Sequence, residues 1–164
     1  MEINRKKTFK ELILNPVKFR LFLLNKIPMA FLAGLRVIEF SEERAIVTVP
    51  YKFLTQNPFK SIYFACLAMA GELSTGVLAM LNTYKSNPPV SLLVIGMEAV
   101  FIKKATGRIR FECKQGLEFS KAVQESIETG ESRQVIAESI GMDENGDQVA
   151  KFKITWSFKA KTSV

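Results

Sequence analysis

Residues 61–82 read SIYFACLAMAGELSTGVLAMLN, a stretch that is apolar on every face of a helical projection. Its one charged residue is Glu72, near the middle. A helix that is hydrophobic all round belongs in the interior of a protein, and a carboxylate held there is costly unless it has partners or a chemical task. We therefore expect the rest of the chain to wrap this helix, and Glu72 is the first candidate functional residue.

The composition describes one globular domain with an affinity for apolar and anionic partners. The chain has 164 residues, 48% of them hydrophobic, which favours an apolar ligand or interface. The formal net charge of +7 suits a phosphate-bearing cofactor, nucleic acid or an acidic membrane surface. Two cysteines without a CxxC pair, and no signal-peptide pattern, predict a reducing, cytoplasmic location and no metal site.

The chain contains no histidine. This excludes Ser-His-Asp and Cys-His catalysis, and with them histidine-dependent dehydration. Any hydrolytic chemistry must therefore rely on another base.

Residues 1–34 have helical spacing interrupted by prolines. We expect the basic residues 1–10 to be frayed, Thr8 to cap the first helix, and Pro16 and Pro28 to divide the region into two short helices. Two roles stay open: a cover for one end of the core, or a membrane-surface anchor, because Lys10, Lys18, Arg20 and Lys26 lie among large apolar residues. The apolar runs are shorter than the ~18 residues of a transmembrane segment, so none is expected.

The segments around the apolar helix have strand periodicity. Residues 35–40 and 44–50 predict a hairpin, and the apolar run 90–103 predicts a strand buried on both faces or used at a subunit interface. Residues 108–114 alternate strictly, residues 117–129 predict a helix, and residues 135–142 and 149–159 predict a hairpin through Asn145-Gly146. An antiparallel sheet curved around one helix leaves an apolar edge, so we expect a homodimer or a dimer of dimers.

The spacing Asn57-x3-Ser61-x10-Glu72, at the start of a buried helix after two strands, resembles the hotdog-fold acyl-CoA thioesterases. It is similar in particular to the branch of that superfamily long labelled a domain of unknown function with a thioesterase role. Residues 101–107 and 143–150 also look like strand ends of this family. The resemblance covers about residues 35–159 and implies an α+β hotdog fold, a long central helix wrapped by a curved, predominantly antiparallel sheet. It implies a single domain over 1–164, with an N-terminal helical extension over 1–34 and a hotdog core over 35–159.

The resemblance also implies a thioester hydrolase with defined site residues. Glu72 takes the position of the general base or nucleophile, and Asn57 that of the amide that orients the water or substrate. The oxyanion donors are the backbone N–H groups at the helix start, near Phe64 and Ala65. The substrate is an acyl-CoA or another acyl thioester, so coenzyme A is part of the substrate and no cofactor is expected. The further residues expected to contact the substrate are Tyr63, Ser61, Thr75 and Ser91. The residues expected to contact the phosphates of coenzyme A are Lys103, Lys104 and Arg108.

The chain departs from the family pattern at the helix start, which keeps other interpretations open. Tyr63 occupies the histidine position, and Lys60 and Ala65 occupy glycine positions. A catalytically silent acyl- or lipid-binding protein is the main alternative, whereas nucleic-acid binding lacks a stacking or recognition-helix motif. Simpler roles also exist for the site residues. Glu72 can pair with Arg36 or Arg108, and Asn57 can be a turn residue. The three basic residues proposed for phosphate contacts can belong to a solvated turn.

Overall fold

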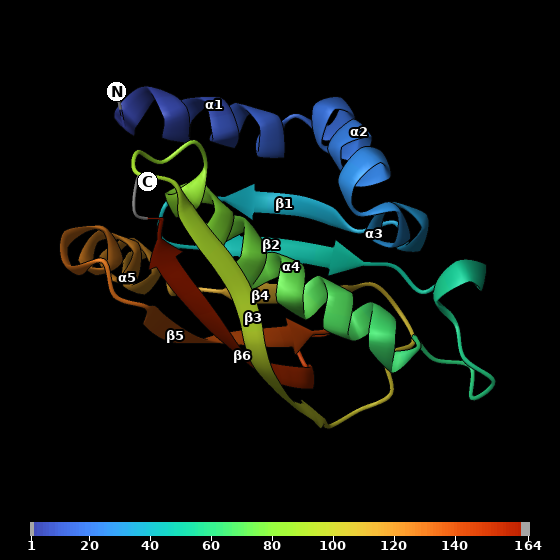
Figure 1. Ribbon diagram of the computed structural model, residues 1–164. Coiled ribbons are helices and arrows are strands. Elements are labelled where there is room, and N and C mark those ends of the chain that lie inside the picture. Colours follow the sequence, from blue (N-terminus) through green and yellow to red (C-terminus); the bar gives the residue numbers. More distant parts are fainter. Residues whose placement is uncertain (1, 162–164) are drawn as a thin grey trace.

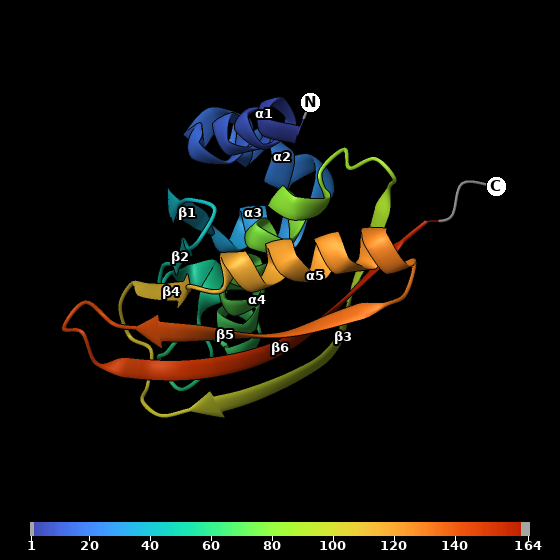
Figure 2. The ribbon, with the colours of Figure 1, turned by 90° about the vertical axis from the view of Figure 1, so that its left-hand side faces the viewer.

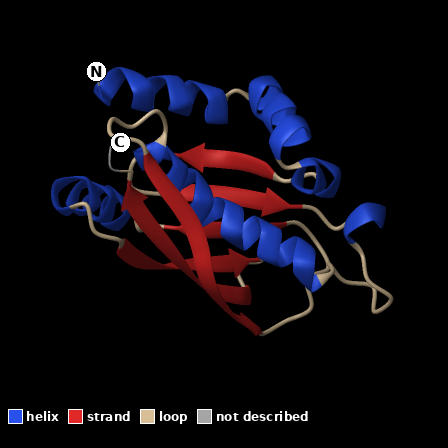
Figure 3. Cartoon of the chain, in the orientation of Figure 1, coloured by secondary structure: helices blue, strands red, loops and turns tan. Residues whose placement is uncertain are grey.

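The computed structural model describes residues 2–161, and its helices and strands are shown in Figures 1 and 3. In chain order the elements are α1 (Glu2–Leu14), α2 (Pro16–Lys26), α3 (Pro28–Ala33), β1 (Arg36–Phe40), β2 (Ala45–Val49), the short helix η1 (Phe53–Thr55), α4 (Phe64–Thr83), β3 (Val90–Phe101), β4 (Ile109–Cys113), α5 (Gly116–Thr129), β5 (Arg133–Met142) and β6 (Gln148–Ala160).

Six strands form one antiparallel sheet in the order β1-β2-β4-β5-β6-β3. The sheet curves around α4, and α5 lies along β5 and β6 (Figures 1 and 2). The register of β3 on β6 shifts between Val94 and Gly96, and such bulges increase the local twist of a strand. The two hairpins and the β4 strand agree with the alternation of the sequence.

The central helix is buried because small residues on α4 meet large aromatic residues on the sheet. Gly71 is buried, and a Cβ at this position would lie 2.7 Å from the ring of Phe152. The inward residues of β6 are all buried: Phe152, Ile154, Trp156 and Phe158. The prediction that the apolar stretch forms the buried helix of the domain is confirmed.

The N-terminal helices differ from the sequence prediction. The expectation of a frayed segment and of a cap at Thr8 is wrong, because α1 already begins at Glu2; Met1 lies outside the described residues. The Arg5 guanidinium donates to the backbone oxygens of Asn82 (3.1 Å) and Tyr84 (2.9 Å), which ties α1 to the end of α4. Three helices form instead of two, because Pro16 and Pro28 each occupy the first turn of a new helix, where proline is tolerated.

The expectation that the apolar run after α4 is a strand buried on both faces is wrong for one copy of the chain. β3 forms one edge of the sheet. Its exposed apolar side chains are Leu93, Ile95, Met97, Val100 and Phe101. The alternative, a strand used at a subunit interface, stays a prediction, and a long exposed apolar edge is a template for pairing with another chain.

A long helix wrapped by a curved antiparallel sheet is the hotdog arrangement, and the predicted α+β hotdog fold is confirmed. By length and composition alone α4 is also apolar enough to cross a membrane, but 67% of its most apolar window is buried inside the fold. Burial in the core therefore accounts for the composition of this helix.

Candidate functional site

The N-terminal end of α4 carries backbone donors without acceptors. Tyr63 precedes the helix in an extended conformation (φ −61°, ψ 134°), and no side chain caps it. The N–H groups of Cys66 and Leu67 reach the carbonyl oxygen of Tyr63 at 2.9 and 3.3 Å. Within residues 2–161 the N–H groups of Phe64 and Ala65 have no acceptor. Free N–H groups and the helix dipole together favour a negative charge at this point.

A pocket of about 570 Å³ opens at this end of the helix. Three exposed aromatic rings of its lining contact one another in series: Tyr63 contacts Phe64 with ring centroids 4.8 Å apart, and Phe64 contacts Phe101 at 6.3 Å. The complete lining is Asn57, Pro58, Phe59, Ser61, Ile62, Tyr63, Phe64, Leu67, Phe101, Ile102, Lys103, Lys104 and Ala105. A mostly apolar wall beside free backbone donors suits an apolar ligand with one polar, electron-rich group.

Glu72 lies in the middle of α4, and none of the ion pairs among residues 2–161 involves it. Its carboxylate is accommodated by Gly76, where a Cβ would lie 3.1 Å from Glu72 Oε1, and by the ring of Trp156 beside that position. Burial raises the pKa of Glu72 from 4.5 to about 7. A carboxyl group with this pKa exists in both protonation states at neutral pH, as a general acid or base requires.

The raised pKa of Glu72 predicts a stability loss toward alkaline pH. Folding favours the protonated form, so this contribution to stability is complete below pH 4.5 and is lost as the pH rises through about 7. The loss is at most ~3 kcal/mol. Glu72→Gln has no charge to bury, so urea unfolding at about pH 8 should show the variant more stable than the wild type, and the two should be equally stable at about pH 4. Parallel stability profiles for the two proteins would contradict the assignment.

Glu72 and the free N–H groups are too far apart in one chain to act on the same atom. Seven residues separate Ala65 from Glu72 along α4, which corresponds to roughly 10 Å at about 1.5 Å per residue. A general base and an oxyanion donor must each lie about 3 Å from the reacting group. One copy of the chain therefore does not bring these two predicted elements together.

Asn57 and Ser61 organise the loop ahead of α4. Asn57 Oδ1 accepts hydrogen bonds from the backbone N–H groups of Phe59 (2.9 Å) and Ser61 (3.3 Å), and from Ser61 Oγ (3.2 Å). Its Nδ2 donates to the carbonyl oxygen of Ile62 at 3.4 Å. Both residues line the pocket, but their polar groups already form hydrogen bonds within the loop. This is what the simpler interpretation, in which Asn57 is a turn residue, predicts.

Thr75 and Ser91 lie away from the pocket. Thr75 is buried; its Oγ1 donates to the carbonyl oxygen of Glu72 and accepts from Trp156 Nε1, both at 2.9 Å. Ser91 donates to the carbonyl oxygen of Lys159 and lies at the end of β3 opposite Phe101. Ten residues of strand place it roughly 30 Å from the pocket.

The three basic residues predicted for phosphate contacts have different surroundings. Lys103 Nζ lies 2.7 Å from Asp143 Oδ2 and 2.5 Å from Asp147 Oδ2. The hydrogen bonds that Lys103 donates to both carboxylates raise the pKa of its ammonium group, and the two negative charges offset its positive charge. Lys104 is exposed and lines the pocket, whereas Arg108 is exposed outside the lining. Lys104 is therefore the best placed of the three for an anionic group.

Sequence reasoning missed the apolar lining from distant segments. Phe59, Leu67 and Ile102 line the pocket beside Phe101. The only sequence signal for Phe101 and Ile102 was the strand end that resembles the family. Within residues 2–161, no group of three or more metal-ligating side chains is placed to hold a metal ion.

The chain matches one known protein family. The profile of a domain of unknown function (DUF4442) matches residues 17–158. Among curated proteins no match is found.

Several solved structures share the fold. A Pseudomonas aeruginosa protein described as a probable thioesterase has a TM-score of 0.75 at 23% identity, with 89% of this chain and 97% of that chain covered. A Chlorobaculum tepidum protein of unknown function has a TM-score of 0.73 at 16% identity, covering 91% and 99%. A Haemophilus influenzae thioesterase has a TM-score of 0.64 at 11% identity, covering 89% and 91%. At these identities the likeness shows the fold.

Proposed function

The chain belongs to the DUF4442 family, and from this premise we propose that it is a hydrolase of acyl thioesters such as acyl-CoA. One observation carries the proposal: the same buried helix holds an unpaired carboxyl group with a pKa of about 7 and two free N–H groups beside an apolar pocket. These are a base and oxyanion donors, the two requirements of thioester hydrolysis. The description of fold relatives as thioesterases supports the same reaction class.

The complete site requires two copies of the chain. One stripe of α4 is only partly buried, and it consists of Ala65, Ala68, Met69 and Glu72. These positions follow the three- and four-residue spacing of one helix face, and the two alanines permit close approach of another helix. When two such stripes pack antiparallel about a twofold axis near residues 68 and 69, Glu72 of one copy lies opposite Ala65 of the other. This arrangement unites the carboxylate with the N–H groups that one copy keeps apart.

The reaction proceeds as base-assisted hydrolysis. The Glu72 carboxylate takes a proton from water, and the resulting hydroxide attacks the thioester carbonyl carbon. The N–H groups of Phe64 and Ala65 donate to the oxyanion that forms. The C–S bond then breaks, the thiolate takes the proton from Glu72, and a carboxylic acid and a thiol are released. The acyl chain lies along Phe64 and Phe101, and the exposed ammonium group of Lys104 meets the anionic part of coenzyme A.

A second function, binding of an acyl ligand without hydrolysis, is favoured by one observation. The ring of Phe64 stands at the first helical position, 55% exposed, beside the N–H groups that would bind the oxyanion. A bulky ring there can keep the carbonyl out of reach of the donors while the apolar wall still holds the chain.

An assay with acyl-CoAs of graded chain length separates the two functions. Release of free thiol that is saturable in substrate supports hydrolysis. Tight acyl-CoA binding by calorimetry without thiol release supports the silent alternative. Absence of both binding and hydrolysis across the series contradicts both functions.

The edge strand β3 provides a test of the two-copy site. The double substitution Met97→Lys with Val100→Lys adds two charges at exposed apolar positions of this edge, and lysines on an edge strand oppose pairing with another chain. We expect sedimentation equilibrium to show dimers for the wild type and monomers for the variant, with unchanged circular dichroism and at least tenfold lower hydrolysis.

The matched control is Ile136→Lys, an exposed apolar position on the inner strand β5. It should leave both mass and activity unchanged. A wild type that is monomeric while fully active would refute the shared site.

A further inference from the structure

Helix α2 is apolar on two opposite sides. Phe19 and Leu23 are buried against the domain, while Val17, Leu21 and Leu24 form a second stripe that is 67%, 60% and 50% exposed. Their spacing of four and three residues puts these three side chains on one face. A surface helix of a globular domain normally presents polar residues on its outer face, and Figure 1 shows α2 at the periphery of the molecule.

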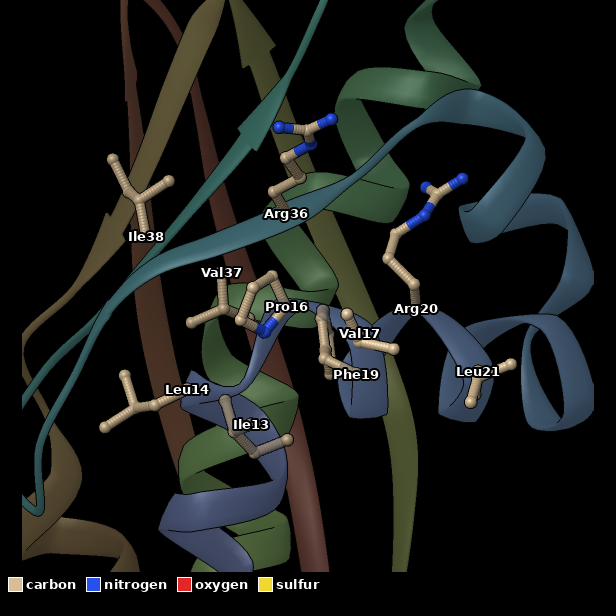
Figure 4. Close-up of a pocket in the computed structure, with 10 residues that line it drawn as sticks. All are labelled: Ile13, Leu14, Pro16, Val17, Phe19, Arg20, Leu21, Arg36, Val37 and Ile38. Atoms are coloured by element: carbon tan, nitrogen blue, oxygen red, sulfur yellow. The ribbon is translucent and has the colours of Figure 1, made fainter.

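The exposed stripe continues into a groove of about 600 Å³ between the N-terminal helices and β1. Val17 and Leu21 line it together with Leu14 and the edge-strand residue Ile38, which are 51% and 45% exposed. In the view of Figure 4 the guanidinium groups of Arg20 and Arg36 lie above the side chains of Val17, Phe19 and Leu21. Together these exposed apolar side chains form a docking surface, which consists of Leu14, Val17, Leu21, Leu24 and Ile38.

All the formal charges within residues 12–38, which contain the docking surface, have one sign. Residues 12–38 contain no Asp or Glu, and the four basic residues in this range are Lys18, Arg20, Lys26 and Arg36. None of the ion pairs among residues 2–161 involves any of the four. Arg20 instead stacks over the Phe31 ring at 3.8 Å and donates to the Phe31 carbonyl oxygen. The surface thus combines exposed apolar side chains with a rim of uncompensated positive charge.

We propose that the docking surface binds the face of an anionic phospholipid bilayer. A bilayer offers negative headgroups and an apolar interior at adjacent depths, which matches a basic rim around apolar side chains. α2 has 11 residues, too few to span a bilayer, so it lies in the plane of the interface with Val17, Leu21 and Leu24 inserted. This inference does not depend on the hydrolytic function.

A second copy of the chain is a poorer occupant of the same surface. In a twofold contact each copy presents the same patch to the other, so the four cations of one copy would face the four cations of the second. Residues 12–38 offer no carboxylate to compensate them. Removing like charges from water without a counter-charge opposes association.

Sedimentation of the full-length protein with lipid vesicles tests the proposal. We expect binding to vesicles of phosphatidylcholine mixed with phosphatidylglycerol, weak binding to vesicles of phosphatidylcholine alone, and a decrease with added salt. The double variant Val17→Gln with Leu21→Gln should lower the apparent affinity at least tenfold. Lys18→Gln and Arg36→Gln should each lower it about fivefold.

The matched control is Ile136→Gln, because Ile136 on β5 is exposed to the same 60% as Leu21. Equal vesicle binding by this control and by the wild type, with loss in the α2 variant, supports the proposal. Absence of binding to anionic vesicles at low salt overturns it, as does binding that the α2 variant retains in full. A lower oligomeric mass of the α2 variant without any vesicle binding also overturns it and assigns the surface to a second copy.

Discussion

Glu72→Gln is expected to lower kcat for acyl-thioester hydrolysis roughly 10²- to 10⁴-fold, with KM little changed. Glutamine keeps the size of the side chain but cannot take a proton from water. Substrate binding depends on the apolar pocket at the helix end, which the substitution does not touch. Steady-state kinetics on the acyl-CoA that is hydrolysed best would measure both constants.

Glu118→Gln is the matched control, since it removes the same charge from an exposed position on α5. It should retain wild-type kinetics. The wild-type rate should also rise with pH through about 7, the pKa of Glu72, as the carboxylate forms. Full activity of Glu72→Gln would remove this carboxyl group from the mechanism.

A mixture of two inactive variants distinguishes a shared site from a site within one chain. Phe64→Pro removes a backbone donor at the first helical position, where proline fits because Tyr63 before it is already extended. Phe64→Ala is its control, because it removes the ring and keeps the N–H group. When Glu72→Gln and Phe64→Pro chains form mixed dimers, one of the two shared sites is intact, so roughly a quarter of the wild-type rate should return. No recovery would place both groups in the same chain.

Gly116→Ala is expected to destabilise the protein by at least ~3 kcal/mol. A Cβ at Gly116 would lie 1.8 Å from the backbone oxygen of Glu42, and the Gly116 N–H group donates to the Glu43 oxygen at 2.9 Å. Both neighbours are backbone of the β1–β2 turn, so no side-chain rotation can relieve the contact. Urea unfolding would measure the change in free energy.

The matched control is Gly96→Ala on β3. A Cβ there would meet only Thr155, with its nearest atom at 3.6 Å, an ordinary contact. Its unfolding free energy should change by less than ~1 kcal/mol. Equal stability of the two variants would mean that the turn moves away from α5 without cost.

The strands and helices could be predicted because local periodicity reflects which side of each element is buried. Strict alternation marked Ile109, Phe111 and Cys113 as inward residues of β4, and all three are buried. The period of two and the period of 3.6 are properties of the backbone itself, so they can be read without knowledge of neighbouring elements. The same reading failed at Thr8, because the start of α1 depends on the contact of Arg5 with the end of α4, about eighty residues away.

The identity of the candidate site residues could be predicted from the sequence, but the partners that the fold brings to them could not. Spacing and resemblance identified Glu72, Phe64 and Ala65. The engagement of Lys103 by Asp143 and Asp147 requires segments forty residues apart to meet.

By itself the sequence determined that a single apolar helix with one carboxylate lies inside an antiparallel sheet, because the hydrophobic pattern of each segment leaves no other way to bury it. Only the tertiary structure decided that β3 is an edge, that Glu72 has no ion-pair partner among residues 2–161, and that the outer stripe of α2 is uncovered. An apolar side chain has the same sequence pattern whether its cover comes from its own chain, from a second copy or from a lipid surface. Only the arrangement of the elements in space shows which apolar faces the chain itself covers.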